Sequence, residues 1–224
     1  MTDTPLRHVA AFDFDGTLTR RDTLIPFLMR VSGRTRFAQV CTQLGLLGAR
    51  RRVDVRDRDE LKIEMIRRLF VGRSEDHLRE SGRLYARDLV ANELDPGVLT
   101  RLELHRDAGH EVLFVSASLV YYLDPIAEQF GLRGVIAVEP AVDGDRLTGA
   151  LTHPNVRAEQ KAARLREWMG GPATGPLDGV DLWAYGNSSG DHALLELADH
   201  RYWRGRPAKI PAGAELFVPT PTLP

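Results

Sequence analysis

Short apolar runs alternate with longer amphipathic stretches along most of the chain. Residues 8–14 have the composition of a buried strand, and the run ends in carboxylates and a glycine. Residues 111–115, 134–138 and 181–185 are further apolar runs of strand length. Strands that alternate with helical patterns are typical of a parallel sheet covered by helices on both faces. We therefore predict the α/β fold class, with a Rossmann-like, mostly parallel sheet flanked by helices.

A long helical stretch interrupts this alternation after the first strand. Apolar side chains recur there every three or four positions in two series: Phe37, Val40, Cys41, Leu44 and Leu47, then Leu61, Met65 and Leu69. The mixed charges of residues 50–60, between the two series, predict a solvated loop that leads into a helix. We therefore expect an α/β core made of residues 1–20 and 93–224, and an inserted all-helical cap made of residues 21–92.

The second half of the chain continues the α/β alternation. Helices are predicted over residues 96–109, 119–130 and 158–168. Asp143-Gly144-Asp145 lies between two β-leaning segments and predicts a hairpin turn. The tail over residues 207–224 is rich in proline and predicts an extended surface segment.

The composition excludes several classes of protein. With 224 residues, 43% hydrophobic and 27% charged, the chain has the profile of a globular domain rather than of a disordered segment. A formal net charge of −1 argues against a nucleic-acid partner. The single cysteine, Cys41, excludes an intrachain disulfide. We see neither a signal peptide nor an apolar run long enough to span a bilayer, so we expect a cytoplasmic location.

Lysine is scarce among the basic residues. Of 30 lysines and arginines, only Lys62, Lys161 and Lys209 are lysines. We therefore consider a specific role for each of these three lysines.

Polar side chains lie at the carboxyl ends of predicted strands and at one helix start, where open α/β sheets place their ligands. They are Asp13, Asp15, Ser116, Lys161, Asn187 and Asp191. Each one alone is commonly a turn former or a solvated side chain. Their shared position at strand ends indicates one site.

The pair Asp13 and Asp15 predicts charge chemistry. If the strand continues through both residues, their carboxylates point the same way and repel each other unless a cation or a proton is present. Such a pair suits Mg²⁺, and it also suits a division of labour between a nucleophile and a proton carrier. Gly16 allows a tight turn whose amides face an anion, while Ser116 and Lys161 supply a donor and a point charge for a phosphate.

These residues, in this order, resemble the motifs of the haloacid dehalogenase superfamily. The motifs are Asp13-Phe14-Asp15-Gly16-Thr17, Ser116, Lys161 and Gly186-Asn187-Ser188-Ser189-Gly190-Asp191. The helical insertion after the first motif resembles the type-1 cap of the phosphoserine-phosphatase-like branch, subfamily IB. The resemblance covers residues 9–204 and implies the same α/β core with an inserted cap.

The resemblance also implies roles for the site residues. Asp13 would be the nucleophile that forms an aspartyl-phosphate, and Asp15 would protonate the leaving oxygen and then activate water. Phosphate would be bound by Ser116, Lys161, Gly16 and Ala117, and Mg²⁺ by Asp13, Asp15, Asn187 and Asp191. A carboxylic acid at Asp15 favours phosphate chemistry over carbon–halogen cleavage, which needs no acid there.

Two positions depart from the family pattern. Asn187 stands where an aspartate metal ligand is usual, so we expect weaker metal affinity without loss of catalysis. Ala158 stands where a glycine is frequent, which affects only the local backbone.

The cap offers weaker indications of the substrate. Asp22 matches a position where phosphoserine phosphatases place a glutamate near the substrate amine, but it equally suits an N-cap of the next helix. Arg67 and Arg68 are candidate anion-binding residues, of which at most one faces the cleft. The apolar and arginine-rich residues 37–52 either contact an anionic membrane or, as we favour, pack inside the cap or against a second subunit.

We therefore predict a Mg²⁺-dependent phosphatase that hydrolyses a phosphorylated small molecule. The alternatives are a lipid-headgroup phosphatase of the phosphatidylglycerol phosphate type, a phosphotransferase, and a non-catalytic binding protein of the same fold. Peripheral membrane contact is the less favoured expectation, and neither the substrate nor the oligomeric state follows from the sequence.

Overall fold

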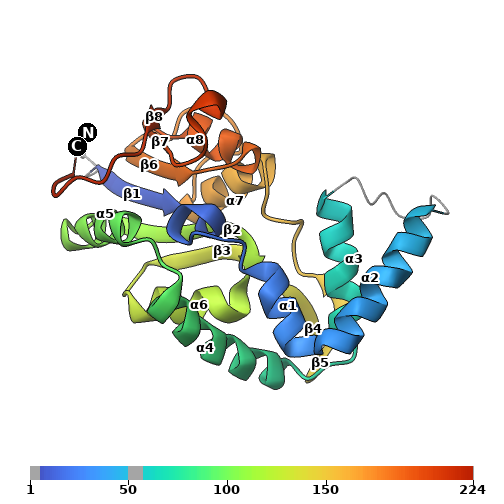
Figure 1. Cartoon of the computed structure of the whole chain (residues 1–224). Coiled ribbons are helices and arrows are strands. Elements are labelled where there is room, and N and C mark those ends of the chain that lie inside the picture. Colours follow the sequence, from blue (N-terminus) through green and yellow to red (C-terminus); the bar gives the residue numbers. More distant parts are fainter. Residues whose placement is uncertain (1–5, 50–57, 224) are drawn as a thin grey trace.

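A six-stranded parallel sheet forms the centre of the molecule (Figure 1). The computed structural model of the chain describes residues 6–49 and 58–223. The strands are β1 (Arg7–Phe12), β2 (Glu111–Leu119), β3 (Gly134–Val138), β6 (Val180–Gly186), β7 (His200–Trp203) and β8 (Glu215–Leu216). Their order in the sheet is β3-β2-β1-β6-β7-β8, and every neighbouring pair is parallel. The predicted fold class is confirmed.

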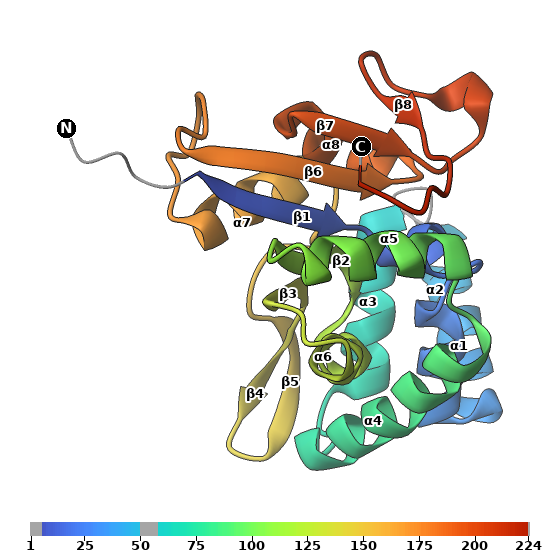
Figure 2. The same cartoon turned by 90° about the vertical axis from the view of Figure 1, so that its left-hand side faces the viewer.

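Alternating side chains of β1 send two apolar surfaces to opposite faces of the sheet. Val9 and Ala11 pack with the face covered by α7 (Glu159–Met169) and α8 (His192–Leu197). Ala10 and Phe12 pack with the opposite face, which is covered by α5 (Pro96–Asp107) and α6 (Val120–Gln129). Figure 2 shows these helix layers on the two sides of the sheet. Because both faces are covered, β1 is apolar at every position from Val9 to Phe12, as expected for a central parallel strand.

Four helices form the insertion between β1 and α5: α1 (Leu24–Ser32), α2 (Arg34–Ala49), α3 (Arg58–Phe70) and α4 (Glu75–Asn92). The last of them, α4, packs along α6, and their backbones approach closely because Gly82 has no side chain. A Cβ at Gly82 would lie 2.1 Å from the Tyr121 carbonyl oxygen. The insertion therefore shares one apolar cluster with the α5/α6 face of the sheet.

The strands β4 (Pro140–Asp143) and β5 (Arg146–Leu151) form a hairpin in the second half of the chain. This hairpin packs against α3. Its turn is the predicted Asp143-Gly144-Asp145. The backbone amide of Gly72, in the α3–α4 turn, donates to the Leu147 carbonyl at 2.8 Å. The insertion is thus held to the core by both α4 and this hairpin.

Several details differ from the sequence expectations. The first strand ends at Phe12 rather than residue 14, whereas β2 continues through Ser116 to Leu119. Cys41 was expected on the apolar side of its helix but is exposed, because Val40 and Leu44 alone fill the buried stripe of α2. Residues 50–57 of the mixed-charge segment lie outside the described residues.

The proline-rich tail contributes more to the fold than an extended surface segment would. Its residues Glu215 and Leu216 form β8, the edge strand that pairs with β7. Within residues 6–49 and 58–223, no helix combines the length and apolar character needed to cross a bilayer.

Candidate active site

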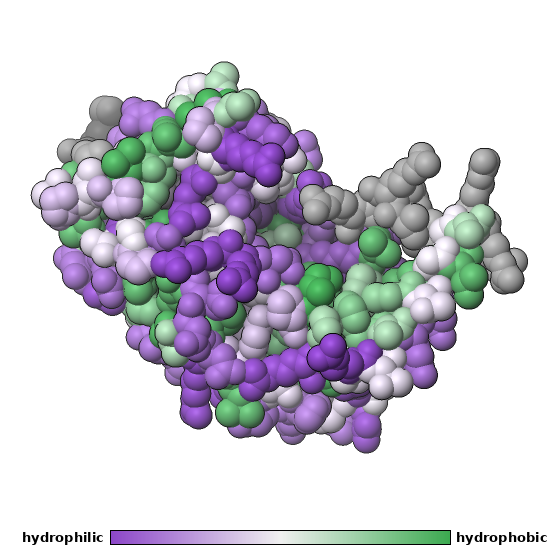
Figure 3. Space-filling view, in the orientation of Figure 1, coloured by the Kyte–Doolittle hydropathy of each residue, from purple (hydrophilic) through white to green (hydrophobic). Residues whose placement is uncertain are grey.

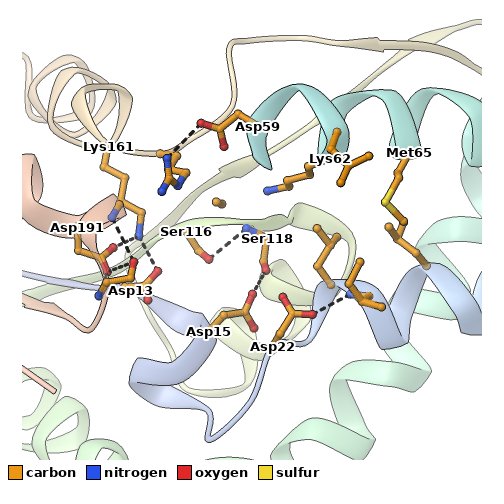
Figure 4. Close-up of a pocket in the computed structure, with 18 residues that line it drawn as sticks. Asp13, Asp15, Asp22, Asp59, Lys62, Met65, Ser116, Ser118, Lys161 and Asp191 are labelled. Carbon is orange, nitrogen blue, oxygen red and sulfur yellow. Dashed lines mark hydrogen bonds and ion pairs between the residues drawn. The ribbon is translucent and has the colours of Figure 1, made fainter. Parts of the chain in front are cut away.

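A pocket of about 310 Å³ lies between the carboxyl ends of the central strands and the helices α1 and α3. Parallel pairing brings these strand ends together, since Phe12 of β1 is in register with Phe114 of β2 and Tyr185 of β6. The core side is lined by Asp13, Asp15, Ser116, Ala117, Ser118, Arg157, Lys161, Ser188, Gly190 and Asp191. The insertion side is lined by Asp22, Leu24, Ile25, Leu28, Asp59, Leu61, Lys62 and Met65. Figure 4 shows how these side chains converge.

Lys161 bridges two aspartates on the core side of the pocket. Its Nζ lies 2.5 Å from Asp13 Oδ1 and 2.5 Å from Asp191 Oδ1, and all three residues are buried. Burial and the charge of Asp191 outweigh the lysine and raise the pKa of Asp13 to about 7. Burial acts on Asp191 too, but Lys161 and backbone donors more than offset it and lower the pKa of Asp191. One lysine therefore does not fully compensate the two carboxylates.

Asp191 is held in its ionised form by its own loop. Its Oδ2 accepts hydrogen bonds from the Asn187 amide at 3.1 Å, the Ser188 amide at 2.9 Å and the Ser188 hydroxyl at 2.9 Å. Donors aimed at one carboxylate oxygen favour the charged form, so Asp191 is a fixed negative charge facing Lys161.

Asp15 lies on the other side of the pocket floor, at the entrance to the insertion. Its Oδ1 accepts from the Thr23 amide at 2.8 Å and the Thr23 hydroxyl at 2.6 Å, and its Oδ2 accepts from the Ser118 hydroxyl. Burial raises the pKa of Asp15 despite these donors. A carboxyl group with a raised pKa at a pocket wall is suited to carry a proton.

A turn, not a continued strand, brings Asp13 and Asp15 to one pocket. Asp15 and Gly16 have non-helical backbone angles within the segment Phe14–Leu18, and Gly16 has φ 78°. The expectation of two carboxylates side by side on one strand face was therefore wrong in its geometry. The positive φ favours glycine at position 16, and a Cβ there would also lie 2.0 Å from Asn187 Nδ2, so the Asn187 side chain would have to move.

The donor set at Asp13 and Asp191 fits a hard divalent cation. Two buried carboxylates lie within reach of one nitrogen, and burial together with the charge of Asp191 raises the pKa of Asp13. Oxygen ligands of this kind suit Mg²⁺. Among the described residues, no group of three or more histidine, cysteine, aspartate or glutamate side chains forms a ready-made metal site, so water and backbone oxygens would complete the coordination.

The remaining residues expected from the sequence are placed unevenly. Ser116 and Ala117 line the pocket, whereas Gly16 and Asn187 pack against each other beside it. Asp22 lines the pocket and also accepts a hydrogen bond from the Ile25 amide at 3.1 Å, so its side chain does cap α1.

Arg67 and Arg68 are not among the residues that line the pocket. Both guanidinium groups contact Glu64 on their own helix, at 2.7 Å and 2.6 Å. The structure therefore does not bring either arginine to the candidate site.

Sequence reasoning missed a polar group on the insertion side. Lys62 Nζ donates to Asn155 Oδ1 at 3.1 Å, and burial lowers the pKa of Lys62 to about 8. Asn155 in turn donates to Asp59 Oδ1 at 2.7 Å, and Arg157 lies 3.3 Å from Asp59 Oδ2. The scarcity of lysine was the one sequence signal that pointed to Lys62.

Apolar side chains of α1 and α3 complete the insertion side of the pocket. Figure 3 shows hydrophobic surface over α1 and α2, beside the hollow between the core and these helices. Leu24, Leu28 and Met65 extend this surface into the pocket. A ligand that enters therefore meets charged groups at the core and apolar groups at the insertion.

Comparisons with known proteins agree on one family. The family model described as "haloacid dehalogenase-like hydrolase" matches residues 10–196. Protein CicA of Caulobacter vibrioides is 31% identical over 205 residues, which cover 89% of this chain and 88% of that protein. A histidinol-phosphatase of Neisseria meningitidis is 24% identical and covers 64% of this chain and 62% of its own length.

Solved structures show the same fold. A protein of unknown function from Bordetella pertussis has a TM-score of 0.74 at 23% identity, covering 91% of this chain and 92% of its own. A phosphoserine phosphatase with an analogue of its phospho-aspartyl intermediate has a TM-score of 0.58 at 16% identity, covering 91% and 89%. The chain thus shares its fold with a phosphoserine phosphatase.

Proposed function

The chain belongs to the haloacid dehalogenase-like hydrolase family, and from this membership we propose that it is a Mg²⁺-dependent phosphatase that hydrolyses small-molecule phosphomonoesters through an aspartyl-phosphate. One observation carries the proposal: a buried carboxylate paired with a lysine shares a pocket with a second carboxyl group of raised pKa. The first carboxylate can serve as the nucleophile for phosphoryl transfer, and the second carboxyl group can supply the proton that an alcohol leaving group needs.

The first step transfers the phosphoryl group to Asp13. A carboxylate oxygen of Asp13 attacks phosphorus, the bond from phosphorus to the alcohol oxygen breaks, and Asp15 gives that oxygen its proton. Lys161 contacts Asp13, favours its ionised form against the effect of burial, and balances the negative charge of the transferring group. Ser116 and Ala117 line the same end of the pocket and donate to the phosphoryl oxygens.

The second step returns Asp13 to its carboxylate. Asp15, now ionised, takes a proton from water as the water oxygen attacks phosphorus, and the bond between phosphorus and the Asp13 oxygen breaks. Mg²⁺ bound by Asp13, Asp191 and the Asp15 carbonyl would neutralise charge on the phosphoryl group in both steps. Inorganic phosphate is the product.

The insertion over residues 21–92 acts as the cap in this proposal. A cavity of about 310 Å³ suits a compact metabolite. The buried residues of α2, Val40 and Leu44, pack within the cap, so the structure gives no specific support to a lipid substrate.

Hydrolysis of p-nitrophenyl phosphate with and without Mg²⁺ tests the proposal. We expect turnover that requires the metal and is abolished in Asp13→Asn. The variant Lys209→Met, which changes an exposed lysine outside the pocket, is the control for purification and handling. Transfer of phosphate to added alcohols in preference to water would indicate a phosphotransferase instead. No turnover across a broad panel of phosphorylated metabolites would favour a binding protein.

A further inference from the structure

Lys62 places a second cation in the pocket, on the cap side. We propose that Lys62 binds an anionic group, a carboxylate or a phosphate, that the leaving group of the substrate carries in addition to the scissile phosphoryl group. The proposal rests on the phosphatase function above and narrows it to one substrate class: compact phosphomonoesters with a second acidic group.

The direction of the side chain supports this role. Figure 4 shows the Lys62 amine pointing from α3 into the pocket, toward the side on which Ser116 and Ser118 lie. Among the charged neighbours of Lys62, Asp15 has the largest effect on its pKa and favours its protonated form. The amine therefore faces the space that a leaving group on the Asp15 side would occupy.

The amine also retains capacity to bind a ligand. A lysine has three N–H donors, and within the described residues Lys62 makes one hydrogen bond, to Asn155 Oδ1 at 3.1 Å. Burial lowers the pKa of Lys62 to about 8, and no carboxylate in the part of the chain that the structure describes forms an ion pair with its amine. An anionic ligand would supply the missing partner.

Lys62 is not needed to hold the cap on the core. Asn155 Nδ2 contacts Asp59 Oδ1 at 2.7 Å, and Arg157 contacts Asp59 Oδ2 at 3.3 Å. These two contacts join α3 to the segment before α7 without the lysine. Removal of the Lys62 charge therefore leaves this connection in place.

The two lysines divide the pocket between two anions. Lys161 already serves the phosphoryl end, where it contacts Asp13 and Asp191. Lys62 comes from the cap, beside the apolar side chains of Leu61 and Met65. A substrate that satisfies both ends has a short, largely apolar body between its phosphoryl group and its second acid.

Matched substrates test the assignment. The first pair is 4-carboxyphenyl phosphate and phenyl phosphate, and the second is 4-(phosphonooxy)butanoate and butyl phosphate. Butane-1,4-diol bisphosphate forms a third arm, which distinguishes phosphate from carboxylate as the second acid. Each is measured with wild type, Lys62→Met, Lys62→Arg and Lys209→Met, whose lysine is exposed and outside the pocket.

We expect wild type and Lys209→Met to prefer the acidic member of a pair by roughly 10- to 100-fold in kcat/KM. Lys62→Met should lose far more kcat/KM on the acidic member than on the neutral member, so that the preference disappears, and Lys62→Arg should restore part of the preference. No preference in wild type, or an equal loss on both members in Lys62→Met, would overturn the proposal. An equal loss would place Lys62 on the phosphoryl group or in folding, which thermal unfolding of the variant distinguishes.

Binding separates failure of this proposal from failure of the phosphatase function. If no compound is hydrolysed, calorimetry with 4-carboxybenzylphosphonate and benzylphosphonate still measures the contribution of Lys62. Tighter binding of the carboxylated compound by wild type than by Lys62→Met supports the assignment. Equal affinities in the two proteins contradict it.

Discussion

The core side of the pocket, here called the floor, contains Lys161, and the insertion side, here called the wall, contains Lys62. The two lysines have opposite electrostatic surroundings. On the floor, two carboxylates contact Lys161, and their attraction outweighs burial and raises its pKa. On the wall, burial dominates and lowers the pKa of Lys62 to about 8. The floor residues form a network that is specified by contacts within the protein, whereas the charge on the wall is left for a ligand to match. The proposed function therefore assigns the phosphoryl chemistry to the core and substrate selection to the cap.

Removal of Lys161 tests the floor and has the largest expected effect. Lys161→Met leaves two buried carboxylates without their cation, so we expect a loss of about 3–5 kcal/mol in the free energy of unfolding as well as loss of turnover. Urea denaturation measures the loss. The double variant Asp13→Asn with Lys161→Met should recover part of the stability, since one repelling charge is gone; an additive double variant would show that the charges are not coupled.

The pH dependence of substrate preference tests the wall. Lys62 is charged below its pKa of about 8 and neutral above it. The charged groups that affect this pKa are Asp15, Asp59 and Asp22, which raise it, and Lys161, which lowers it. The preference in kcat/KM for the carboxylated substrate should therefore fall by roughly 10-fold as the pH rises above 8. The ratio of the two substrates cancels titrations common to both. In Lys62→Arg the ratio should stay high across this range, and a falling ratio there would exclude Lys62 as the titrating group.

The helix that carries Lys161 begins at a strained residue. Ala158, at the position where the family often has glycine, has φ 51° and ψ −126°. Ala158→Gly should relieve this strain and raise the free energy of unfolding by ~1 kcal/mol, after the entropy that glycine adds to the unfolded chain. Thermal unfolding measures the change. An unchanged or lower stability would mean that the floor tolerates this backbone without cost.

Removal of Lys62 should change stability least. Lys62→Met exchanges a desolvated amine for an apolar side chain of similar length, so we expect a change of about 1 kcal/mol or less in the free energy of unfolding, in either direction. The contrast with Lys161→Met is the point of the measurement. A large loss on the wall would show that Lys62 belongs to the structural network after all.

The fold of the core and the location of most candidate site residues were predictable from local sequence. Strand β1 is recognisable in the sequence as an apolar run followed by Asp13 and Asp15. The alternation of strands and helices predicts a parallel sheet, so Ser116 and Asp191 are expected at the same carboxyl-terminal edge of the sheet. The tight turn at Gly16 was predicted, but the end of the strand at Phe12 was not, because all of residues 8–14 have the composition of a strand. The expected roles of Asn187, Arg67 and Arg68 were based on their positions along the chain. Position along the chain does not determine the direction in which a side chain points.

The sequence by itself determined the α/β class, the helical insertion and the family, because hydrophobic period and ordered motifs are local properties of the chain. Only the tertiary structure decided which charges meet. It turned Asn187 toward Gly16, placed Lys62 in the pocket and left Arg67 and Arg68 out of the pocket lining. The placement of Lys62 depends on how α3 docks against the segment around Asn155, some ninety residues away along the chain. Side-chain electrostatics act through space, so they are settled by packing rather than by spacing.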